Sequence, residues 1–288
     1  MEPIDKDKKF YNIPFMVWLR NLLYLMFYRK PFQNIKYPIL WALAYGLVYP
    51  LPRIIFGRER AKNICDSFLG NYRSTTLSLP SPWKSKIMMR WSDYGLYSEI
   101  YIRDVYCKEL LKEGMNVIDV GAHIGTYTIL AAEKIGKNGK IVAIEPEPQN
   151  YERLLENIKL NNLQNVVPIK IALTDHNGFE KLYLSSSSVC HSLIFKENKE
   201  SYINVSVKIL DKLLEELNLK RVDIIKIDAE GAEIPILKGA EKTLKANPNT
   251  KIIVAAERYP SQAKEINQFL QGTGFKTKFF RKGIAITI

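Results

Sequence analysis

From about residue 116 onwards, short apolar runs alternate with segments of helical spacing. The runs have the length and branched apolar content of buried strands, and they are NVIDV (116–120), KIVAIE (140–145), NVVPIKIAL (165–173), VDIIKID (222–228) and KIIVAAE (251–257). The helical segments are GTYTILAAEKIG (125–136), PQNYERLLENIKLNN (148–162) and SQAKEINQFLQGTG (261–274). Such alternation predicts an α/β fold built on a doubly wound sheet.

Two local features predict departures from a purely parallel sheet. Pro168 interrupts the third run and, because proline has no N–H for the ladder, indicates an irregular or edge strand. The last two runs, FKTKFF (275–280) and IAITI (284–288), are separated by RKG and predict a closing hairpin.

Acidic residues stand at the ends of the predicted strands. Asp119 closes the first strand, Glu145 the second, Asp228 and Glu230 follow the fourth, and Glu257 closes the fifth. A parallel sheet binds ligands at the carboxyl ends of its strands, so these acids are expected to surround a site. Carboxylates also suit a divalent cation, but nothing in the pattern requires one, and we expect a site without metal.

The segment DVGAHIGTYT (119–128) joins the first strand to the first helix. Glycines at 121 and 125 allow the backbone to pass close to a ligand, and the N–H groups of the helix start point towards it. The spacing is G-x-x-x-G and not the G-x-G-x-x-G of a dinucleotide site, which argues against a nicotinamide cofactor. Glu145, about twenty residues beyond the loop, is placed to accept hydrogen bonds from the ribose of an adenosine ligand. The alternative is a tight turn with a solvated acid.

The first ninety residues carry most of the positive charge. The whole chain has a formal net charge of +12, and residues 1–90 hold 15 Lys and Arg against 5 Asp and Glu, a net +10. Their longest uncharged run, 37–52, has 16 residues and two prolines, whereas a membrane-spanning helix needs about 20 apolar residues. Short apolar and aromatic stretches among bases are typical of an interfacial anchor. We therefore predict a helical extension over residues 1–90 that binds a membrane surface through residues 10–60, ahead of a catalytic domain at 91–288.

Two other interpretations of this extension stay open. Its aromatic side chains could form core against the following domain, or they could pack against a second subunit in a homodimer. The basic excess could also be a nucleic-acid footprint, but the bases stand among aliphatic runs and no nucleic-acid motif accompanies them, which argues against that partner.

The cysteines and the start of the chain bear on localisation. Three distant cysteines, Cys65, Cys107 and Cys190, indicate neither a disulfide framework nor a zinc site, and the start MEPIDKDKKF does not read as a secretory signal. We expect a cytoplasmic protein, peripheral on the cytoplasmic face of the membrane.

Five stretches together resemble the FkbM family of S-adenosylmethionine-dependent methyltransferases. They are VIDVGAHIGTYTILAA, GKIVAIEPEPQNYERLLENIKLNN, IALTDHNG, DIIKIDAEGAEIPILKGA and AAERYP, and KIDAEGAE is the most specific. The resemblance spans roughly residues 95–260 and does not cover residues 1–90. It implies a Rossmann-like class I methyltransferase fold, with a seven-stranded, mostly parallel sheet and an antiparallel last strand. It also implies O-methylation of hydroxyls on sugars, glycans or secondary metabolites.

The resemblance also implies which residues meet the cofactor. The loop is expected to hold the methionine and ribose portions, Glu145 the ribose, and the segment after the third strand the adenine. The residues expected to bind S-adenosylmethionine are Asp119, Gly121, Ala122, His123, Gly125, Thr126, Glu145, Pro146, Ala172, Leu173, Asp175 and Asp228. Two positions depart from the family pattern: His123 stands where Asn is common, and Arg258 where His is common.

Methylation of an alcohol needs a positioned base, because the hydroxyl proton leaves during attack. Asp228 and Glu230 are the leading candidates, while Glu233 is expected to favour the start of a helix. Lys226, two residues before Asp228, could share its face of the strand and hold an acceptor oxygen. His191, in the serine-rich segment SSSSVCHSLIF (185–195), is a further candidate because its ordinary pKa is near neutral, although a solvated loop histidine is the simpler interpretation.

The sequence thus predicts an O-methyltransferase that modifies a sugar hydroxyl of a glycan or lipid-linked saccharide at the membrane surface. One alternative is an RNA methyltransferase, which only the charge favours. Another is a membrane-tethered interaction module that binds the cofactor without turnover, against which the Asp228 and Glu230 pair argues.

Overall fold

The computed structural model describes residues 75–79, 82–90, 93–185, 188–196, 201–256, 258–279 and 284–287. The chain divides into two compact units, Met1–Gly95 and Leu96–Ile288. The predicted anchor at residues 10–60 lies outside the described residues. The described part of the first unit contains an antiparallel hairpin of β1 (Thr75–Ser78) and β2 (Lys86–Met89). The sequence predicted helix over this portion of the extension, and the structure has strands there instead. Within the described ranges, no helix combines the length and apolar character needed to cross a membrane.

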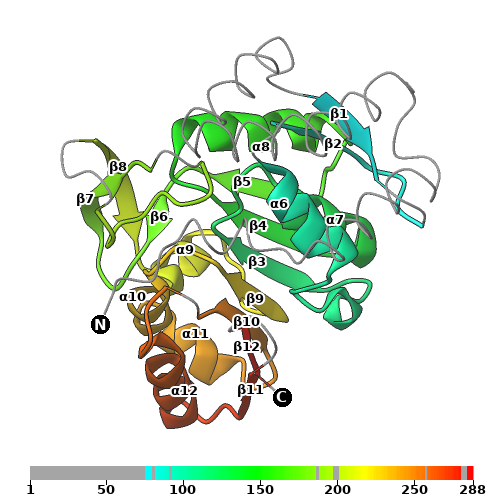
Figure 1. The fold of residues 1–288 in the computed structure, drawn as a ribbon. Helices are drawn as coiled ribbons and strands as arrows, with labels where there is room; N and C mark the ends of the chain where they lie inside the picture. The colour runs from blue at the N-terminus through cyan, green and yellow to red at the C-terminus, as the bar shows by residue number, and fades with distance from the viewer. Residues whose placement is uncertain are drawn as a thin grey trace, which may run out of the picture. The chain divides into compact units, whose positions relative to one another are not determined.

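The second unit is built on a seven-stranded sheet in the order β11-β12-β10-β9-β3-β4-β5 (Figure 1). Its strands are β3 (Asn116–Val120), β4 (Lys140–Ile144), β5 (Val166–Ile169), β9 (Ile224–Ile227), β10 (Lys251–Ala255), β11 (Thr277–Phe279) and β12 (Ile284–Thr287). The first five are parallel, and β12 inserts between β10 and β11 and runs antiparallel to both. The predicted seven-stranded, mostly parallel fold with an antiparallel last strand is confirmed.

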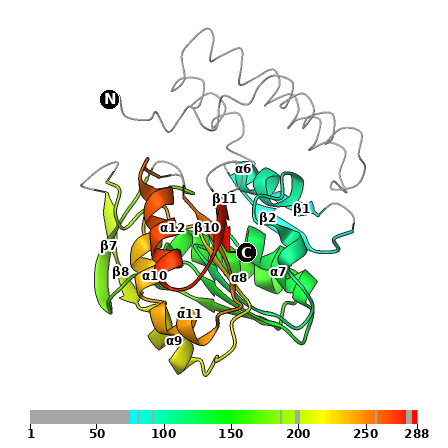
Figure 2. The ribbon, with the colours of Figure 1, turned by 90° about the horizontal axis from the view of Figure 1, so that it is seen from below.

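Helices cover both faces of this sheet. α7 (Thr126–Ile135) and α8 (Pro148–Leu160) connect β3, β4 and β5 on one face. The opposite face is covered by α9 (Leu210–Glu216), α10 (Glu233–Lys238), α11 (Glu241–Ala246) and α12 (Gln262–Gly272), as Figures 1 and 2 show. This division follows from right-handed crossovers. The chain first moves from β3 towards β5 and later from β9 towards β10, which is the opposite direction, so the connecting helices lie on opposite faces. Among the described residues before β3, the helical segments are α6 (Tyr94–Tyr97), a π-helical turn (Ser98–Ile102) and a 3₁₀ turn (Lys108–Leu110).

The central strands are apolar because both of their faces are covered. β9 is buried along its whole length, and all but the first residues of β3 and β4 are buried. Burying each such side chain stabilises the fold by about 1.5–3 kcal/mol, and continuous branched runs are the expected sequence of a two-sided parallel strand. The polar residues that interrupt these runs, Asp119 and Lys226, therefore need partners inside the fold.

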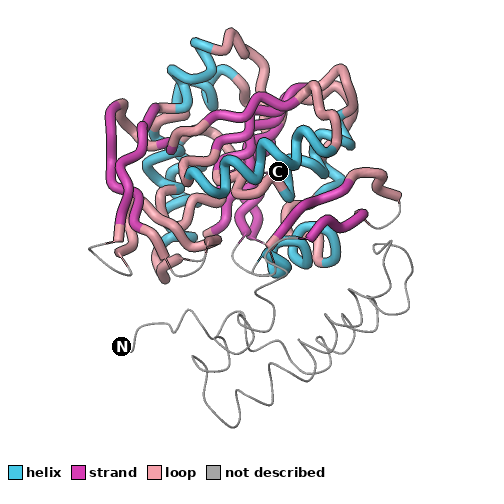
Figure 3. The backbone as a smooth tube through the Cα atoms, turned by 90° about the horizontal axis from the view of Figure 1, so that it is seen from above, coloured by secondary structure: helices cyan, strands magenta, loops and turns pink. Residues whose placement is uncertain are grey.

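The third predicted strand is divided between two sheets. β5 ends at Ile169 on the edge of the central sheet, where Pro168 is tolerated, as its sequence indicated. The rest of the run forms β6 (Ala172–Leu173), which pairs with β8 (Tyr202–Lys208) in a small sheet completed by β7 (Gly178–Tyr183). Figure 3 shows this small sheet beside the central one. The sequence did not predict β7 and β8, since β7 buries only Leu182 and lacks a clear alternation.

Candidate active site

A cavity opens at the carboxyl ends of β3, β4 and β9. Its empty space, including the part open to solvent, is about 870 Å³. Most residues expected to bind the cofactor line it, namely Gly121, Ala122, His123, Thr126, Glu145, Pro146, Ala172, Leu173 and Asp228. The candidate catalytic residues Lys226, Glu230 and His191 line it too. The topology thus brings together residues that are more than a hundred positions apart in the chain.

The glycine loop is held tightly against the neighbouring strands. Gly121 has φ +71°, and a Cβ there would lie 2.0 Å from the carbonyl oxygen of Asp228. Gly125 has φ +87°, and its Cβ would lie 2.6 Å from a methyl carbon of Leu154. The N–H groups of Gly121 and Ala122 both donate to the carbonyl of Ile144, at 3.0 and 2.9 Å. Glycine is required at 121 by both its conformation and its close approach to the end of β9.

Glu145 is fixed at the end of β4 by the loop it faces. Its Oε2 accepts the His123 N–H at 2.8 Å and its Oε1 accepts the Glu147 N–H at 3.0 Å. Burial raises the pKa of Glu145 to about 7, against the opposing effect of these backbone donors. Because His123 contributes its backbone N–H, this contact does not depend on the side chain at that position. The departure from Asn therefore leaves the link between loop and acid intact.

Asp119 and Lys226 form a buried ion pair beneath the loop. The Lys226 Nζ lies 3.0 Å from Asp119 Oδ1, and the other oxygen of Asp119 accepts the Thr128 hydroxyl at 2.6 Å. The same ammonium donates to the carbonyls of Gly121 at 2.8 Å and Val120 at 3.3 Å. Asp119 is fully buried and does not line the cavity, so its contribution to the site is to hold Lys226 in place beneath the loop. Lys226 lines the cavity, but these three acceptors give it the geometry of a residue that positions the loop.

Asp228 has a partner that sequence reasoning missed. The Tyr106 hydroxyl donates to Asp228 Oδ2 at 2.6 Å, and both residues line the cavity. The Asp228 backbone N–H donates to the carbonyl of Val120 at 3.1 Å, which fixes the acid at the end of β9. Tyr106 lies ten residues before β3, outside every recognisable motif, and no signal in the sequence distinguishes it from the other fifteen tyrosines.

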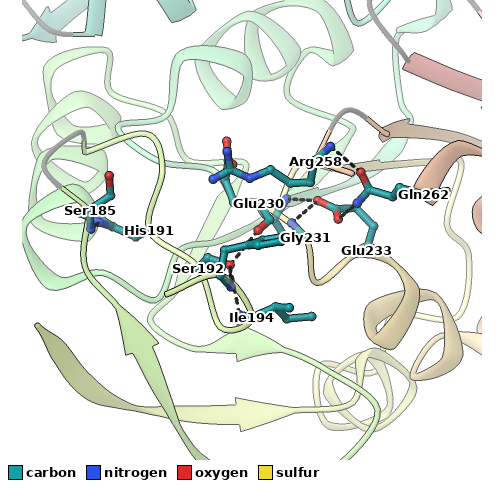
Figure 4. Close-up of polar contacts among 11 residues, drawn as sticks. Ser185, His191, Ser192, Ile194, Glu230, Gly231, Glu233, Arg258 and Gln262 are labelled. Carbon is teal, nitrogen blue, oxygen red and sulfur yellow. Dashed lines mark hydrogen bonds and ion pairs between the residues drawn. The ribbon is translucent and has the colours of Figure 1, made fainter. Parts of the chain in front are cut away.

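Glu230 belongs to a different set of contacts. Its carboxylate is paired with the Arg258 guanidinium, and its carbonyl accepts the Ser192 hydroxyl at 2.7 Å (Figure 4). The Ser192 oxygen also accepts the N–H groups of Ile194 and Phe195, each at 3.0 Å. Glu230 has φ +54°, a conformation that costs energy for a residue other than glycine and that these contacts maintain. The serine-rich segment is thus docked on the turn that follows β9.

Glu233 folds back over the same turn. Its Oε1 accepts the N–H groups of Ala229 at 2.9 Å and Gly231 at 3.2 Å, while its Oε2 accepts from Gln262 (Figure 4). Burial raises the pKa of Glu233 to about 7, despite these donors. It stands at the start of α10, as its sequence position indicated, and its carboxylate holds the turn that carries Asp228 and Glu230.

The structure gives the remaining predicted residues less central positions. His191 lines the cavity, but its Nδ1 accepts the Ser185 N–H at 3.0 Å, and Figure 4 shows these two residues apart from the Glu230 cluster. Asp175 does not line the cavity, and its exposed carboxylate lies 3.0 Å from His176, whose hydrogen bond lowers the pKa of Asp175. Gly125 does not line the cavity and lies against Leu154. Glu257 lies outside the described residues.

The residues present fit an adenosine-type cofactor. A glycine loop allows close approach, and the carboxylate of Glu145 can accept further hydrogen bonds at the strand end, since each carboxylate oxygen has two lone pairs. Apolar side chains of Ile144, Ile171 and Leu173 supply walls for a planar ring system.

Comparison with known proteins identifies the family of the chain. A family model described as a methyltransferase FkbM domain matches residues 119–277, more than half of the chain. Methyltransferase 1 of Beauveria bassiana is 26% identical over 166 residues, covering 51% of this chain and 66% of that protein. Hexuronic acid methyltransferase AglP of Haloferax volcanii is 27% identical over 128 residues, covering 44% of this chain and 51% of that protein.

A solved structure of the same family also aligns. The methyltransferase FkbM from Methylobacillus flagellatus KT matches with a TM-score of 0.47 and 16% identity, over 66% of this chain and 47% of that one. The alignments thus span about half to two thirds of the length of these relatives. From the match over residues 119–277, the chain belongs to the FkbM family of methyltransferases, with S-adenosylmethionine as the cofactor.

Proposed function

We propose that this chain transfers a methyl group to a hydroxyl of a sugar, in a glycan or lipid-linked saccharide at the membrane surface. The observation that carries the proposal is the position of Asp228, whose carboxylate lines the cofactor cavity beside the glycine loop. The hydrogen bond that the structure gives this carboxylate comes from a neutral group, the Tyr106 hydroxyl. A base in that place is what methylation of an alcohol needs.

When bound, S-adenosylmethionine would supply an electrophilic methyl group on a sulfonium, whose sulfur keeps the electrons of the broken S–C bond and leaves as a neutral thioether. Asp228 takes up the hydroxyl proton as the oxygen attacks, and the cavity walls orient the acceptor. Bringing the reacting groups together is the main contribution of the protein to such a displacement. Lys226 and Asp119 position the loop and are not themselves expected to touch the acceptor.

The contacts favour Asp228 over the other two candidate bases. The charge of Glu230 is already balanced by Arg258. His191 accepts a hydrogen bond at Nδ1, which places the proton of a neutral ring on Nε2 and leaves it without a ready site for another. Asp228 is therefore the proposed base, and Glu230 the residue that anchors the serine-rich segment.

Two observations support a saccharide acceptor at a membrane. One relative is named for methylation of a hexuronic acid, a sugar derivative. The net charge of +10 in the first ninety residues, together with their aromatic content, is typical of a segment that binds anionic lipid. The proposal places the enzyme on the cytoplasmic face of the membrane, attached through residues 10–60.

The test uses the full chain and follows the methyl group. Calorimetry first measures binding of S-adenosylmethionine, and a labelled-methyl assay on an extract of membrane lipids and glycans then measures transfer. We expect label in the saccharide fraction, as an ether on a sugar. Label in added tRNA and not in saccharides would show an RNA methyltransferase, and binding without any transfer would show a module without turnover.

The membrane and metal parts are tested separately. Sedimentation with anionic liposomes at low salt is expected to bring the chain into the pellet, and a chain that stays in the supernatant contradicts the anchor. Transfer is expected to persist in EDTA. Loss of transfer that magnesium restores would show that a divalent cation is required.

A further inference from the structure

We propose that Tyr106 is the positioning residue for the base, holding Asp228 in the orientation that methyl transfer requires. The inference rests on the proposed function of Asp228. The two residues are 122 positions apart, and the fold brings the Tyr106 hydroxyl to 2.6 Å from Asp228 Oδ2. That separation is in the range of a hydrogen bond from a hydroxyl to a charged oxygen.

The phenol can act in this way because its surroundings leave it little freedom. Tyr106 is 5% exposed, its ring packs edge-on against Tyr127 with centroids 5.7 Å apart, and the Lys226 ammonium lies 5.5 Å from its ring centroid. A buried hydroxyl needs a partner, and the hydrogen bond that the structure gives this one runs to the carboxylate. The ring is thus a rigid support for Asp228.

The turn that carries Tyr106 is built for that position. Cys107 donates its N–H to the carbonyl of Asp104 at 3.3 Å, so Val105 and Tyr106 occupy the centre of a tight turn. Asp104 and Cys107, with φ of +53° and +50°, are both left-handed although neither is glycine. The Asp104 carboxylate accepts the Lys108 N–H at 2.8 Å and stabilises the turn. Such strained positions persist only where the surrounding structure holds them.

The arrangement divides the oxygens of Asp228 between two tasks. Oδ2 accepts from Tyr106, which leaves Oδ1 to meet the acceptor hydroxyl and take its proton. Tyr106 therefore acts through Asp228, and it need not touch the acceptor.

The test compares Tyr106→Phe with Tyr101→Phe in the full chain. Tyr101 is equally buried, and its hydroxyl donates to the carbonyl of Thr126 at 3.1 Å, so its variant also loses one buried hydroxyl but leaves Asp228 untouched. For Tyr106→Phe we expect kcat for labelled-methyl transfer to the glycan extract to fall roughly ten- to a hundredfold. The dissociation constant of S-adenosylmethionine should stay within about threefold, by the spread expected of a single contact.

The comparison of kcat with cofactor binding separates positioning from a merely structural role. In Tyr106→Phe kcat should fall while the dissociation constant of S-adenosylmethionine stays near the wild-type value, because the substitution disturbs the orientation of Asp228 and not the cofactor site. In Tyr101→Phe kcat should stay near the wild-type value. The inference is overturned if Tyr106→Phe keeps the wild-type rate, or if it loses rate only in proportion to cofactor binding.

Two further results keep this inference distinct from the proposed function. If Asp228→Asn transfers methyl groups like the wild type, the proposed base is wrong; if it is inactive while Tyr106→Phe is normal, only the role of Tyr106 is wrong. The second result comes from crystal structures of the two variants, which can be solved without an acceptor. The Asp228 side chain should occupy more than one rotamer in Tyr106→Phe and a single one in Tyr101→Phe. A single, unchanged rotamer in both variants would contradict the inference.

Discussion

Lys226 and Asp119 face each other across two neighbouring parallel strands, with Nζ 3.0 Å from Oδ1 and both side chains almost fully buried. The register of the sheet pairs these two residues directly, so the ion pair follows from the alignment of β3 with β9. Through its contacts with the carbonyls of Val120 and Gly121, the same ammonium ties the glycine loop to the sheet. The pair thus links the stability of the fold to the shape of the cofactor site.

Replacing Lys226 by Met should strongly destabilise the chain. The substitution leaves the buried Asp119 carboxylate without its cation, which typically costs about 3–5 kcal/mol. Urea unfolding of the full chain measures the loss. Lys245→Met is the matched control, because Lys245 pairs with Glu241 at the surface and such pairs contribute about 0–1 kcal/mol. Equal stability of the two variants would contradict the assigned role of the buried pair.

Gly121→Ala should disrupt the site far more than Gly114→Ala. Both glycines have left-handed φ, +71° and +77°, but a Cβ at 121 would lie 2.0 Å from the Asp228 carbonyl while none of the described atoms lies within 4 Å at 114. The conformation alone costs roughly 1–2 kcal/mol, and the overlap at 121 adds about 1–3 kcal/mol more. Thermal unfolding and calorimetry with S-adenosylmethionine measure both effects. Similar losses at the two sites would show that the close approach is unimportant.

Binding of S-adenosylmethionine should weaken as the pH falls through about 7. Burial raises the pKa of Glu145 to about 7, and hydroxyl donors on a ribose bind a charged carboxylate better than a protonated one. If only the charged form binds, the affinity at pH 6 should be roughly tenfold lower than at pH 8. Calorimetry at the two pH values measures this ratio. In Glu145→Gln the affinity should be low at both, and a wild type with equal affinities would contradict the prediction.

The stability of the fold should decrease as the pH rises from about 5 to about 7. The pKa of Glu233 is raised from an ordinary 4.5 to about 7, so the folded chain binds this proton more tightly than the unfolded chain. The stabilisation is fully present below the unfolded pKa and is lost as the pH rises through the folded one. A shift of this size corresponds to something on the order of 3 kcal/mol, and Glu145 contributes in the same direction.

Urea unfolding at pH 5 and pH 7.5 measures this loss. Glu233→Gln should lose less stability between the two values than the wild type does, since the contribution of Glu233 is gone. Glu241→Gln, at an exposed carboxylate on α11, should behave like the wild type. A loss in Glu233→Gln as large as that of the wild type would show that Glu233 does not titrate in this range.

The sequence identified the strands of the central sheet because each is buried on two faces. Runs such as NVIDV and IIKI can be recognised from apolar content alone, and their order along the chain then fixes the parallel topology. The small sheet was missed because β7 buries a single residue, Leu182, and exposes Phe179. A strand with so little burial carries no periodic signal.

The site was predicted as a set of positions but not as a set of contacts. The strand-end rule placed Glu145 and Asp228 correctly in the cavity wall. Partners such as Tyr106 for Asp228, or Arg258 for Glu230, depend on tertiary packing between distant segments and leave no local pattern. Asp175, which was also predicted to bind the cofactor, lies at the surface instead, where its carboxylate contacts His176.

The most direct test of the account is methyl transfer by Asp228→Asn and His191→Ala, measured with labelled S-adenosylmethionine and the glycan extract. Calorimetry on both variants first establishes that each binds the cofactor. The account predicts that Asp228→Asn binds it but transfers less than about one hundredth of the wild-type label, a typical loss for a missing base. His191→Ala should keep most of the rate. Normal transfer by Asp228→Asn, or its loss in His191→Ala alone, would contradict the assignment of Asp228 as the base.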